Sequence, residues 1–94
     1  MNVVKVNGKN HKHRVFLYAL STCAWCKMTK RFLSDSGVEY EYVDVDLCND
    51  EDRRKIHEDI RKRGAQPSYP VIIVDDKKVI NGFLKNEIKE ALDI

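Results

Sequence analysis

Two cysteines separated by two residues, Cys23-Ala24-Trp25-Cys26, are the part of this chain best suited to chemistry. An apolar run, Val15 to Leu20, precedes them, and a segment of helical character, Lys27 to Ser34, follows them. The free N–H groups and the positive dipole end of a helix's first turn stabilise a thiolate, and the thiolate is the form that attacks disulfides. A CxxC pair between a strand and a helix therefore indicates thiol–disulfide redox chemistry.

The same spacing has two other interpretations, half of a metal site or two small buried residues without chemistry. Cys48 and His57 could complete a ligand set with Cys23 and Cys26, although the gap before Cys48 is long for a structural zinc site. The third cysteine, Cys48, could equally be a small half-buried residue or a regulatory or dimer-forming thiol. These alternatives stay open at the level of the sequence.

Composition excludes several classes of protein. The 94 residues suffice for one domain, and a net charge of +2 from 17 basic and 15 acidic residues gives no reason to expect nucleic acid as a partner. No apolar run approaches the length of a membrane span, so we expect no membrane association. Three cysteines are too few for a disulfide scaffold, which indicates a reducing compartment, the cytoplasm. We expect a monomer that needs no cofactor.

The hydrophobic pattern predicts strands that alternate with helices. Val15–Leu20 is apolar throughout, which is typical of a strand buried on both faces. Leu84, Ile88 and Leu92 recur at helical spacing. The predicted order is β-α-β-α-β-β-α, a layered α/β sheet, with these elements: strands Val15–Leu20, Val38–Asp46, Val71–Val74 and Lys78–Ile80, and helices Ala24–Asp35, Asn49–Gly64 and Leu84–Leu92.

The first residues, 1–14, form an extension before this pattern. Val3–Val6 could be a short strand, and Asn7-Gly8 is a hairpin turn signal. A hairpin would place this strand beside Val15–Leu20. If that strand is central and paired on both sides, the extension must pair at a sheet edge or only with the start of Val15–Leu20.

Two further motifs, with the CxxC pair, carry a family resemblance. Ser68-Tyr69-Pro70 stands directly before a buried strand, and Asn81-Gly82-Phe83 directly follows the last strand. In this order the three motifs resemble the landmarks of the glutaredoxin branch of the thioredoxin fold. The resemblance implies an α/β thioredoxin-like fold over residues 15–94, with a four-stranded mixed sheet flanked by three helices. The extension, residues 1–14, could add a strand to it.

The resemblance also implies roles for individual residues. Cys23 is expected to be the exposed nucleophile, and Cys26, one turn into the helix, the buried resolving thiol. The residue at the position of Pro70 is a cis-proline in the family, which would present the backbone of Tyr69 to an extended substrate. From the residues alone, a trans proline that begins a strand is the simpler interpretation.

Other residues around the thiols are candidates for substrate binding. Trp25 is expected to be exposed and to dock the substrate, although it could instead fold back over Cys26. Tyr69 and Phe83 would complete an apolar rim, with Gly82 beside them, or could be ordinary packing. Lys27 could add positive potential near the thiols or be a solvated helix lysine.

This chain departs from glutaredoxins that use glutathione. Leu20 stands where they typically carry a basic residue, and Asn81-Gly82-Phe83-Leu84 replaces Gly-Gly and the Asp that grips the glutathione amine. Ser68-Tyr69-Pro70 replaces the usual Thr-Val-Pro. Gly82-Phe83 is similar to the NrdH-type redoxins, which deliver electrons to ribonucleotide reductase. We therefore expect protein disulfides as substrates, ribonucleotide reductase among them, a dithiol reductase as electron donor, and weak or absent use of glutathione.

The proline usual within the CxxC motif of the family is replaced by Ala24-Trp25. In relatives an iron–sulfur cluster can bridge two chains through the residue equivalent to Cys23, and loss of this proline favours it. The resemblance therefore leaves an alternative function, an iron–sulfur cluster or metal carrier that uses Cys23.

Overall fold

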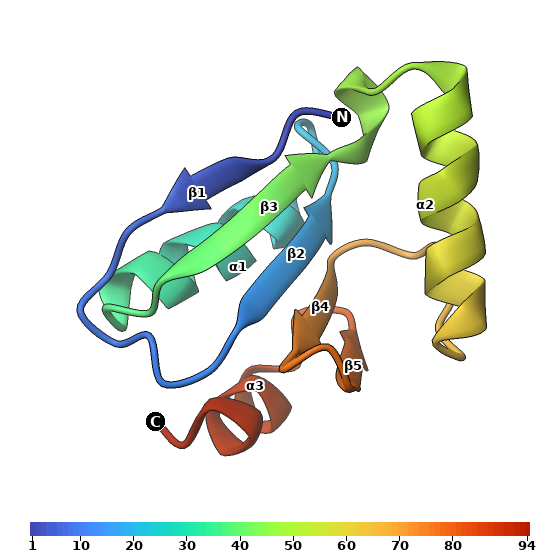
Figure 1. Cartoon of the computed structure of the whole chain (residues 1–94). Helices are drawn as coiled ribbons and strands as arrows, with labels where there is room; N and C mark the ends of the chain where they lie inside the picture. Colours follow the sequence, from blue (N-terminus) through green and yellow to red (C-terminus); the bar gives the residue numbers. More distant parts are fainter.

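Strand β2 (Val15–Ala19) forms the centre of the sheet, because it is apolar on both faces and paired along both edges. The computed structural model describes all residues, 1–94, and shows a five-stranded sheet in the order β1-β3-β2-β4-β5 (Figure 1). β2 pairs in parallel with β3 (Tyr40–Asp44) and antiparallel with β4 (Val71–Val74). β4 continues into β5 (Lys78–Asn81) through a tight turn. The predicted α/β thioredoxin-like fold is confirmed.

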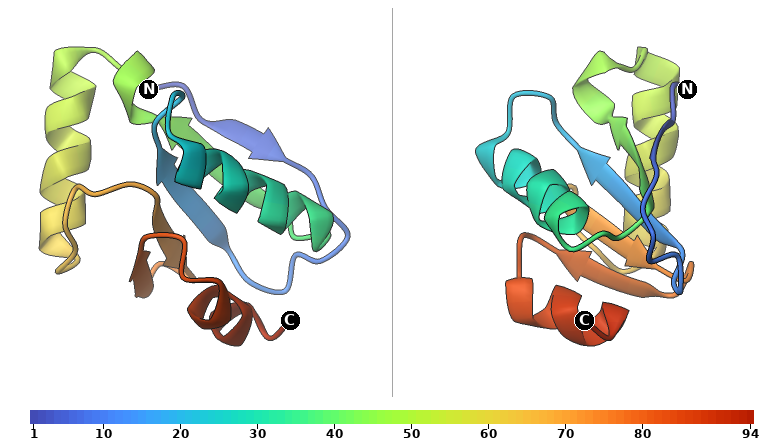
Figure 2. Two further views of the ribbon diagram at one scale, coloured as in Figure 1. Left: turned by 180° about the vertical axis from the view of Figure 1, so that it is seen from behind. Right: turned by 90° about the vertical axis from the view of Figure 1, so that its left-hand side faces the viewer.

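Three helices cover the two faces of the sheet. α1 (Ala24–Asp35) and α3 (Lys85–Leu92) pack on one face, and α2 (Asp50–Lys62) packs on the other (Figure 2). Successive residues of β2 point to opposite faces of the sheet. Leu17 packs in the core between the sheet and helices α1 and α3, and Tyr18 packs in the core between the sheet and α2. None of the helices is both long and apolar enough to cross a membrane.

Local sequence signals explain where α2 begins and ends. The side chain of Asn49 caps the helix by accepting a hydrogen bond from the N–H of Asp52 at 2.8 Å. Acidic residues fill its first turn and basic residues its last turn, which suits the helix dipole. The strand predicted to reach Asp46 is shorter, because a 3₁₀ turn (Val45–Leu47) follows β3 and leads the chain to Asn49.

The N-terminal extension adds strand β1 (Val4–Val6) to the edge of the sheet. β1 pairs antiparallel with β3, with Lys5 opposite Glu41. The hairpin with β2 is therefore wrong, and the pairing at a sheet edge is confirmed; β2 has no free edge, because β3 and β4 occupy both sides. The division of the chain into an extension, residues 1–14, and a domain, residues 15–94, stays a prediction.

Gly8 does not form the hairpin turn that Asn7-Gly8 indicates. It lies against the backbone before β3, where a Cβ would stand 2.5 Å from the carbonyl oxygen of Gly37. Nearby, the N–H of Asn10 donates to the same carbonyl at 2.9 Å. The glycine therefore permits a close approach of two backbones, a role that a turn signal does not reveal.

His13 joins three distant segments at the end of the sheet where β2 begins. Its Nδ1 lies 2.7 Å from the carboxylate of Asp75, in the β4–β5 turn, and its Nε2 lies 3.0 Å from that of Asp93, after α3. The hydrogen bond to Asp75, followed by that to Asp93, raises the pKa of His13 above its ordinary value of 6.5. The imidazole therefore links the segment after α3 to the end of the sheet, and its protonated form carries the charge that both carboxylates favour.

Candidate active site

Cys23 is the N-cap residue of α1. Its backbone is extended, and its Sγ accepts a hydrogen bond from the N–H of Cys26 at 3.3 Å. A sulfur therefore occupies the place where a serine or aspartate oxygen usually caps a helix. Cys23 is half-buried, in contrast to the fully buried Cys26. A thiolate here would accept a charge-assisted hydrogen bond and face the positive end of the dipole.

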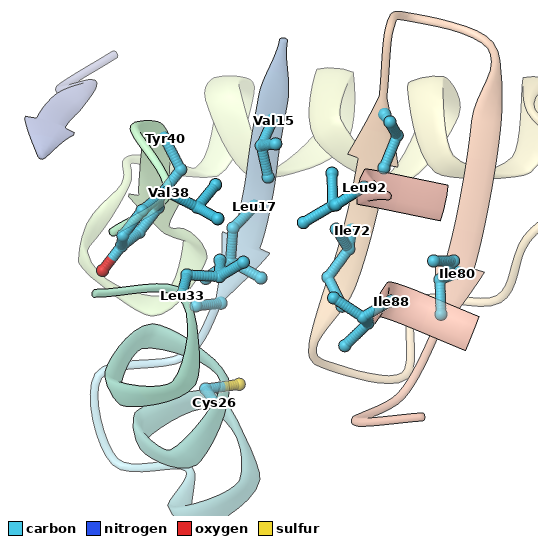
Figure 3. Close-up of a cluster of buried hydrophobic side chains, with 12 residues drawn as sticks. Val15, Leu17, Cys26, Leu33, Val38, Tyr40, Ile72, Ile80, Ile88 and Leu92 are labelled. Atoms are coloured by element: carbon cyan, nitrogen blue, oxygen red, sulfur yellow. The ribbon is translucent and has the colours of Figure 1, made fainter. Parts of the chain in front are cut away.

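Cys26 lies one turn into α1 and is fully buried. Its thiol belongs to the core cluster between α1 and the sheet, beside Leu33 and Leu17 (Figure 3). Burial first, and then the hydrogen bond with Cys23, raise the pKa of the Cys26 thiol well above its ordinary value. The two thiols therefore differ as expected, one accessible and the other buried and held in the protonated form.

Lys30 is the cation that acts on the Cys26 thiol. It stands one turn beyond Cys26 on α1; burial is the largest effect and raises the pKa of that thiol, and the charge of Lys30 lowers it by less. Its ammonium is held by the carboxylate of Asp44 at 3.0 Å and lies 4.0 Å from the ring centroid of Tyr42. Lys27, the candidate from the sequence, is exposed and is not among the charges that shift the pKa of Cys26. The signal for Lys30 was its spacing of four residues from Cys26.

Asp46 fixes the loop that carries Cys23. Its carboxylate accepts hydrogen bonds from the backbone N–H of Ser21, at 2.8 Å, and from the Ser21 hydroxyl. These bonds hold the pKa of Asp46 below its ordinary value. These hydrogen bonds connect the loop after β2 to the 3₁₀ turn after β3, and they orient the start of α1. No local pattern in the sequence revealed this contact.

Tyr69 and Pro70 approach Cys23 from the start of β4. The Tyr69–Pro70 bond is cis, as the resemblance implies, and the Tyr69 carbonyl oxygen lies 4.0 Å from Cys23 Sγ. The Tyr69 ring packs against both core clusters, and its hydroxyl is buried without a hydrogen-bond partner. Burial raises the pKa of that hydroxyl. The backbone of Tyr69, rather than its side chain, is therefore what lies beside the nucleophile.

Asn81 holds the loop before Tyr69 in place. Its side-chain oxygen accepts from the N–H of Gln66 at 2.7 Å, and its amide nitrogen donates to the carbonyls of Gln66, at 3.0 Å, and Ser68, at 2.8 Å. Gly82 follows with a φ of +103°, which favours glycine, and donates its N–H to the Pro70 carbonyl at 2.7 Å. From the sequence, Asn81 indicated only the end of a strand.

Trp25 projects from the first turn of α1 and is 59% exposed. Its ring centroid lies 6.3 Å from that of Phe83, which in turn lies 5.9 Å from that of Phe32. The expectation that Trp25 is exposed is therefore confirmed, and an exposed ring does not seal Cys26 from solvent. Substrate binding by Trp25, Gly82 and Phe83 stays a prediction.

Cys48 takes no part in this arrangement of thiols. It is half-buried after the 3₁₀ turn, its Sγ lies 3.7 Å from the carbonyl oxygen of Asp44, and burial raises its pKa. No three His, Cys, Asp or Glu side chains lie close enough together to hold a metal ion. The single-chain ligand set of Cys23, Cys26, Cys48 and His57 is therefore wrong, because the fold separates its members.

Known proteins share the family and the fold of this chain. The model of the glutaredoxin family matches residues 15–79. A glutaredoxin-like 8.6 kDa protein in the rubredoxin operon of Clostridium pasteurianum is 35% identical over 77 residues, which cover 82% of this chain and 95% of that protein.

Solved structures agree with the family match. The glutaredoxin of Methanosarcina mazei Go1 has a TM-score of 0.88 at 38% identity, covering 98% of this chain and 88% of that one. The methanoredoxin of Methanosarcina acetivorans has a TM-score of 0.77 at 38% identity, covering 86% and 85%. This chain belongs to the glutaredoxin family and is a glutaredoxin-like thiol–disulfide redox protein with the pair Cys23 and Cys26.

Proposed function

We propose that this protein reduces disulfides of other proteins by a dithiol mechanism in the cytoplasm, as a monomer. The observation that carries the proposal is the contrast between the two thiols. Cys23 is open to substrate at the start of α1, whereas Cys26 is fully buried within reach of the same sulfur.

The reaction proceeds in two exchanges. The Cys23 thiolate attacks one sulfur of the substrate disulfide, the substrate S–S bond breaks, and the departing sulfur takes up a proton. Cys26 then loses its proton and attacks Cys23 Sγ, which releases the second substrate thiol and leaves a Cys23–Cys26 disulfide. The substrate gains two electrons, and an external donor must return two electrons to the protein.

Three positions that would hold glutathione in the family are apolar in this chain. Glutathione carries two carboxylates and an amine, whereas Leu20, Phe83 and Leu84 offer neither a cation nor a carboxylate. A loss of about 1.4 kcal/mol in binding is already tenfold in affinity. A dithiol reductase is therefore the proposed electron donor, as for NrdH-type redoxins, and ribonucleotide reductase is a candidate substrate.

Trapping experiments test the mechanism. Cys23→Ser should abolish disulfide reduction, and Cys26→Ser should still attack and accumulate a mixed disulfide with substrate, visible by mass spectrometry. An inert Cys26→Ser together with turnover by Cys23→Ser would reverse the assignment.

A second experiment tests the donor. The oxidised protein is offered glutathione with its reductase, a thioredoxin reductase, and a ferredoxin-linked reductase in parallel. We expect one of the two dithiol reductases to be the fastest. Reduction by millimolar glutathione at the same rate would refute the donor assignment and leave the dithiol mechanism standing.

A second candidate function rests on the partial exposure of Cys23 and on the missing CxxC proline. One accessible thiol per chain is what a cluster bridging two chains requires, so an iron–sulfur carrier is the alternative. Protein purified without oxygen decides between them: a carrier would be brown and contain stoichiometric iron, and a redoxin would be colourless.

A further inference from the structure

A strip of exposed and half-buried apolar side chains runs along α1 from the turn that carries the reactive thiol. Trp25, Met28 and Phe32 recur at helical spacing on one face of α1, and the ring of Phe83 links Trp25 to Phe32. Leu84, at the start of α3, extends the surface and is 45% exposed; Met28 is 48% exposed. We call these five side chains the apolar strip. Exposed contiguous apolar surface of this kind marks an interaction site.

Cations border the strip along α3. The ammonium of Lys85 lies 5.5 Å from the ring centroid of Phe32, and Lys89, one turn further along α3, shares that flank. Glu87 and Glu90 lie on the opposite flank of α3, where they line a depression with the β4–β5 turn. The helix therefore turns its positive charges toward the strip and its negative charges away from it.

Cations also border the strip on the solvent side of α1. Lys27 and Arg31 are exposed one turn apart, next to Met28 in the helical spacing. Lys27, Lys85 and Lys89 form no ion pair within the chain, and Arg31 has only an exposed contact with Asp35 at 3.7 Å. An apolar surface thus lies between two rows of largely uncompensated positive charge.

We propose that the apolar strip binds an acidic, apolar segment of the client protein adjacent to its reactive disulfide. This inference rests on the proposed function and names the class of client. The strip begins at Trp25, two residues from Cys23. A client segment bound on the strip would therefore lie close, along the client chain, to the disulfide that Cys23 attacks. Apolar side chains of the segment would cover the strip, and flanking carboxylates would face the two rows of cations, which also repel basic clients.

Two peptides test the preference. Each carries the same disulfide and the same leucine and phenylalanine residues, flanked by glutamates in one and by lysines in the other. We measure the rate constant of exchange with pre-reduced protein in excess. The acidic peptide should react about tenfold faster at low ionic strength, and the difference should shrink as salt screens the charges.

Variants assign the preference to the strip. Lys85→Glu with Lys89→Glu should remove the advantage of the acidic peptide, and Leu84→Gln should slow both peptides. Lys9→Glu with Lys62→Glu, at exposed sites without ion pairs and away from the strip, makes the same change in net charge and should retain the preference. Circular dichroism confirms that each variant is folded.

A neutral small disulfide, 2-hydroxyethyl disulfide, separates the two proposals. It is too small to cover the strip, so every charge variant should reduce it at the parent rate. Equal rates for the two peptides, or a preference that survives the Lys85→Glu and Lys89→Glu changes, would overturn the acidic client while the redox function stands. Failure to reduce even the neutral disulfide would overturn the redox function. Binding to anionic lipid vesicles that competes with the acidic peptide would assign the strip to a membrane surface instead.

Discussion

Removal of the Asn81 side chain should loosen the loop that presents Tyr69 to the nucleophile. Asn81→Ala deletes all three hydrogen bonds that hold Gln66 and Ser68. A typical hydrogen bond contributes about 0.5–1.5 kcal/mol net to stability, and Asn81 is only half-buried, so water replaces part of the loss. The low end of that range, summed over three bonds, gives about 1.5 kcal/mol.

Urea denaturation measures this loss directly. The midpoint should fall with an unchanged m value, and the melting temperature should fall by roughly 10 °C for a domain of this size. Asn86→Ala, at an exposed position of α3 without side-chain hydrogen bonds, is the matched control and should change stability little.

A third variant separates the role of the Asn81 side chain as a hydrogen-bond acceptor from its role as a donor. Asn81→Asp keeps the acceptor for the Gln66 N–H but replaces the donor that serves two carbonyl oxygens with a negative charge. It should therefore destabilise the protein and slow attack on a protein disulfide. An Asn81→Ala protein within about 0.5 kcal/mol of the parent, with parental rates, would refute the role given to this side chain.

Three further predictions concern other titrating or reactive groups. The raised pKa of His13 means that its protonated form stabilises the fold: this contribution is complete below 6.5, the ordinary pKa, and is lost as pH rises through the folded-state pKa. His13→Gln should thus lower the urea midpoint at pH 5 more than at pH 9; an equal loss at both would contradict the linkage. Lys30→Met removes the charge that lowers the pKa of Cys26, so the pH midpoint for resolving a mixed disulfide should rise, whereas an unchanged profile would show that the ammonium does not act on the thiol. Cys48→Ser should leave turnover within a few-fold of the parent, and a disulfide-linked dimer through Cys48 as the active form, seen on a non-reducing gel, would count against this.

Elements with strong local signals could be predicted from the sequence. α1 begins directly after Cys23, whose side chain caps it, and α2 follows the cap at Asn49, where charges that match the helix dipole also mark both of its ends. β4 was predicted with its observed bounds, Val71–Val74, since a short apolar run between turns leaves little freedom. The roles expected of the two thiols came from their place between a strand and a helix together with the family resemblance.

Contacts between distant segments could not be predicted in this way. Asn81 and Asp46 hold loops that are remote in sequence, and the hydrogen bonds that do so depend on the arrangement of the finished sheet. The hairpin signal at Asn7-Gly8 failed for a related reason, since it is local and ignores that β2 is paired on both sides. The position of the Lys30 ammonium depends on such a contact as well, because its partner Asp44 lies on β3, away from α1 in the sequence.

Strand β1 has a consequence for the colloidal behaviour of the protein. Without it, the outer edge of β3 would offer unpaired backbone groups beside two tyrosines, Tyr40 and Tyr42, a template for strand addition by another chain. β1 closes that edge and presents a shorter one, three residues long, with Lys5 at its centre. Short, charged edges resist edge-to-edge aggregation. The extension therefore protects the sheet against self-association, and a chain that begins at residue 15 would require another means of keeping β3 apart from its neighbours.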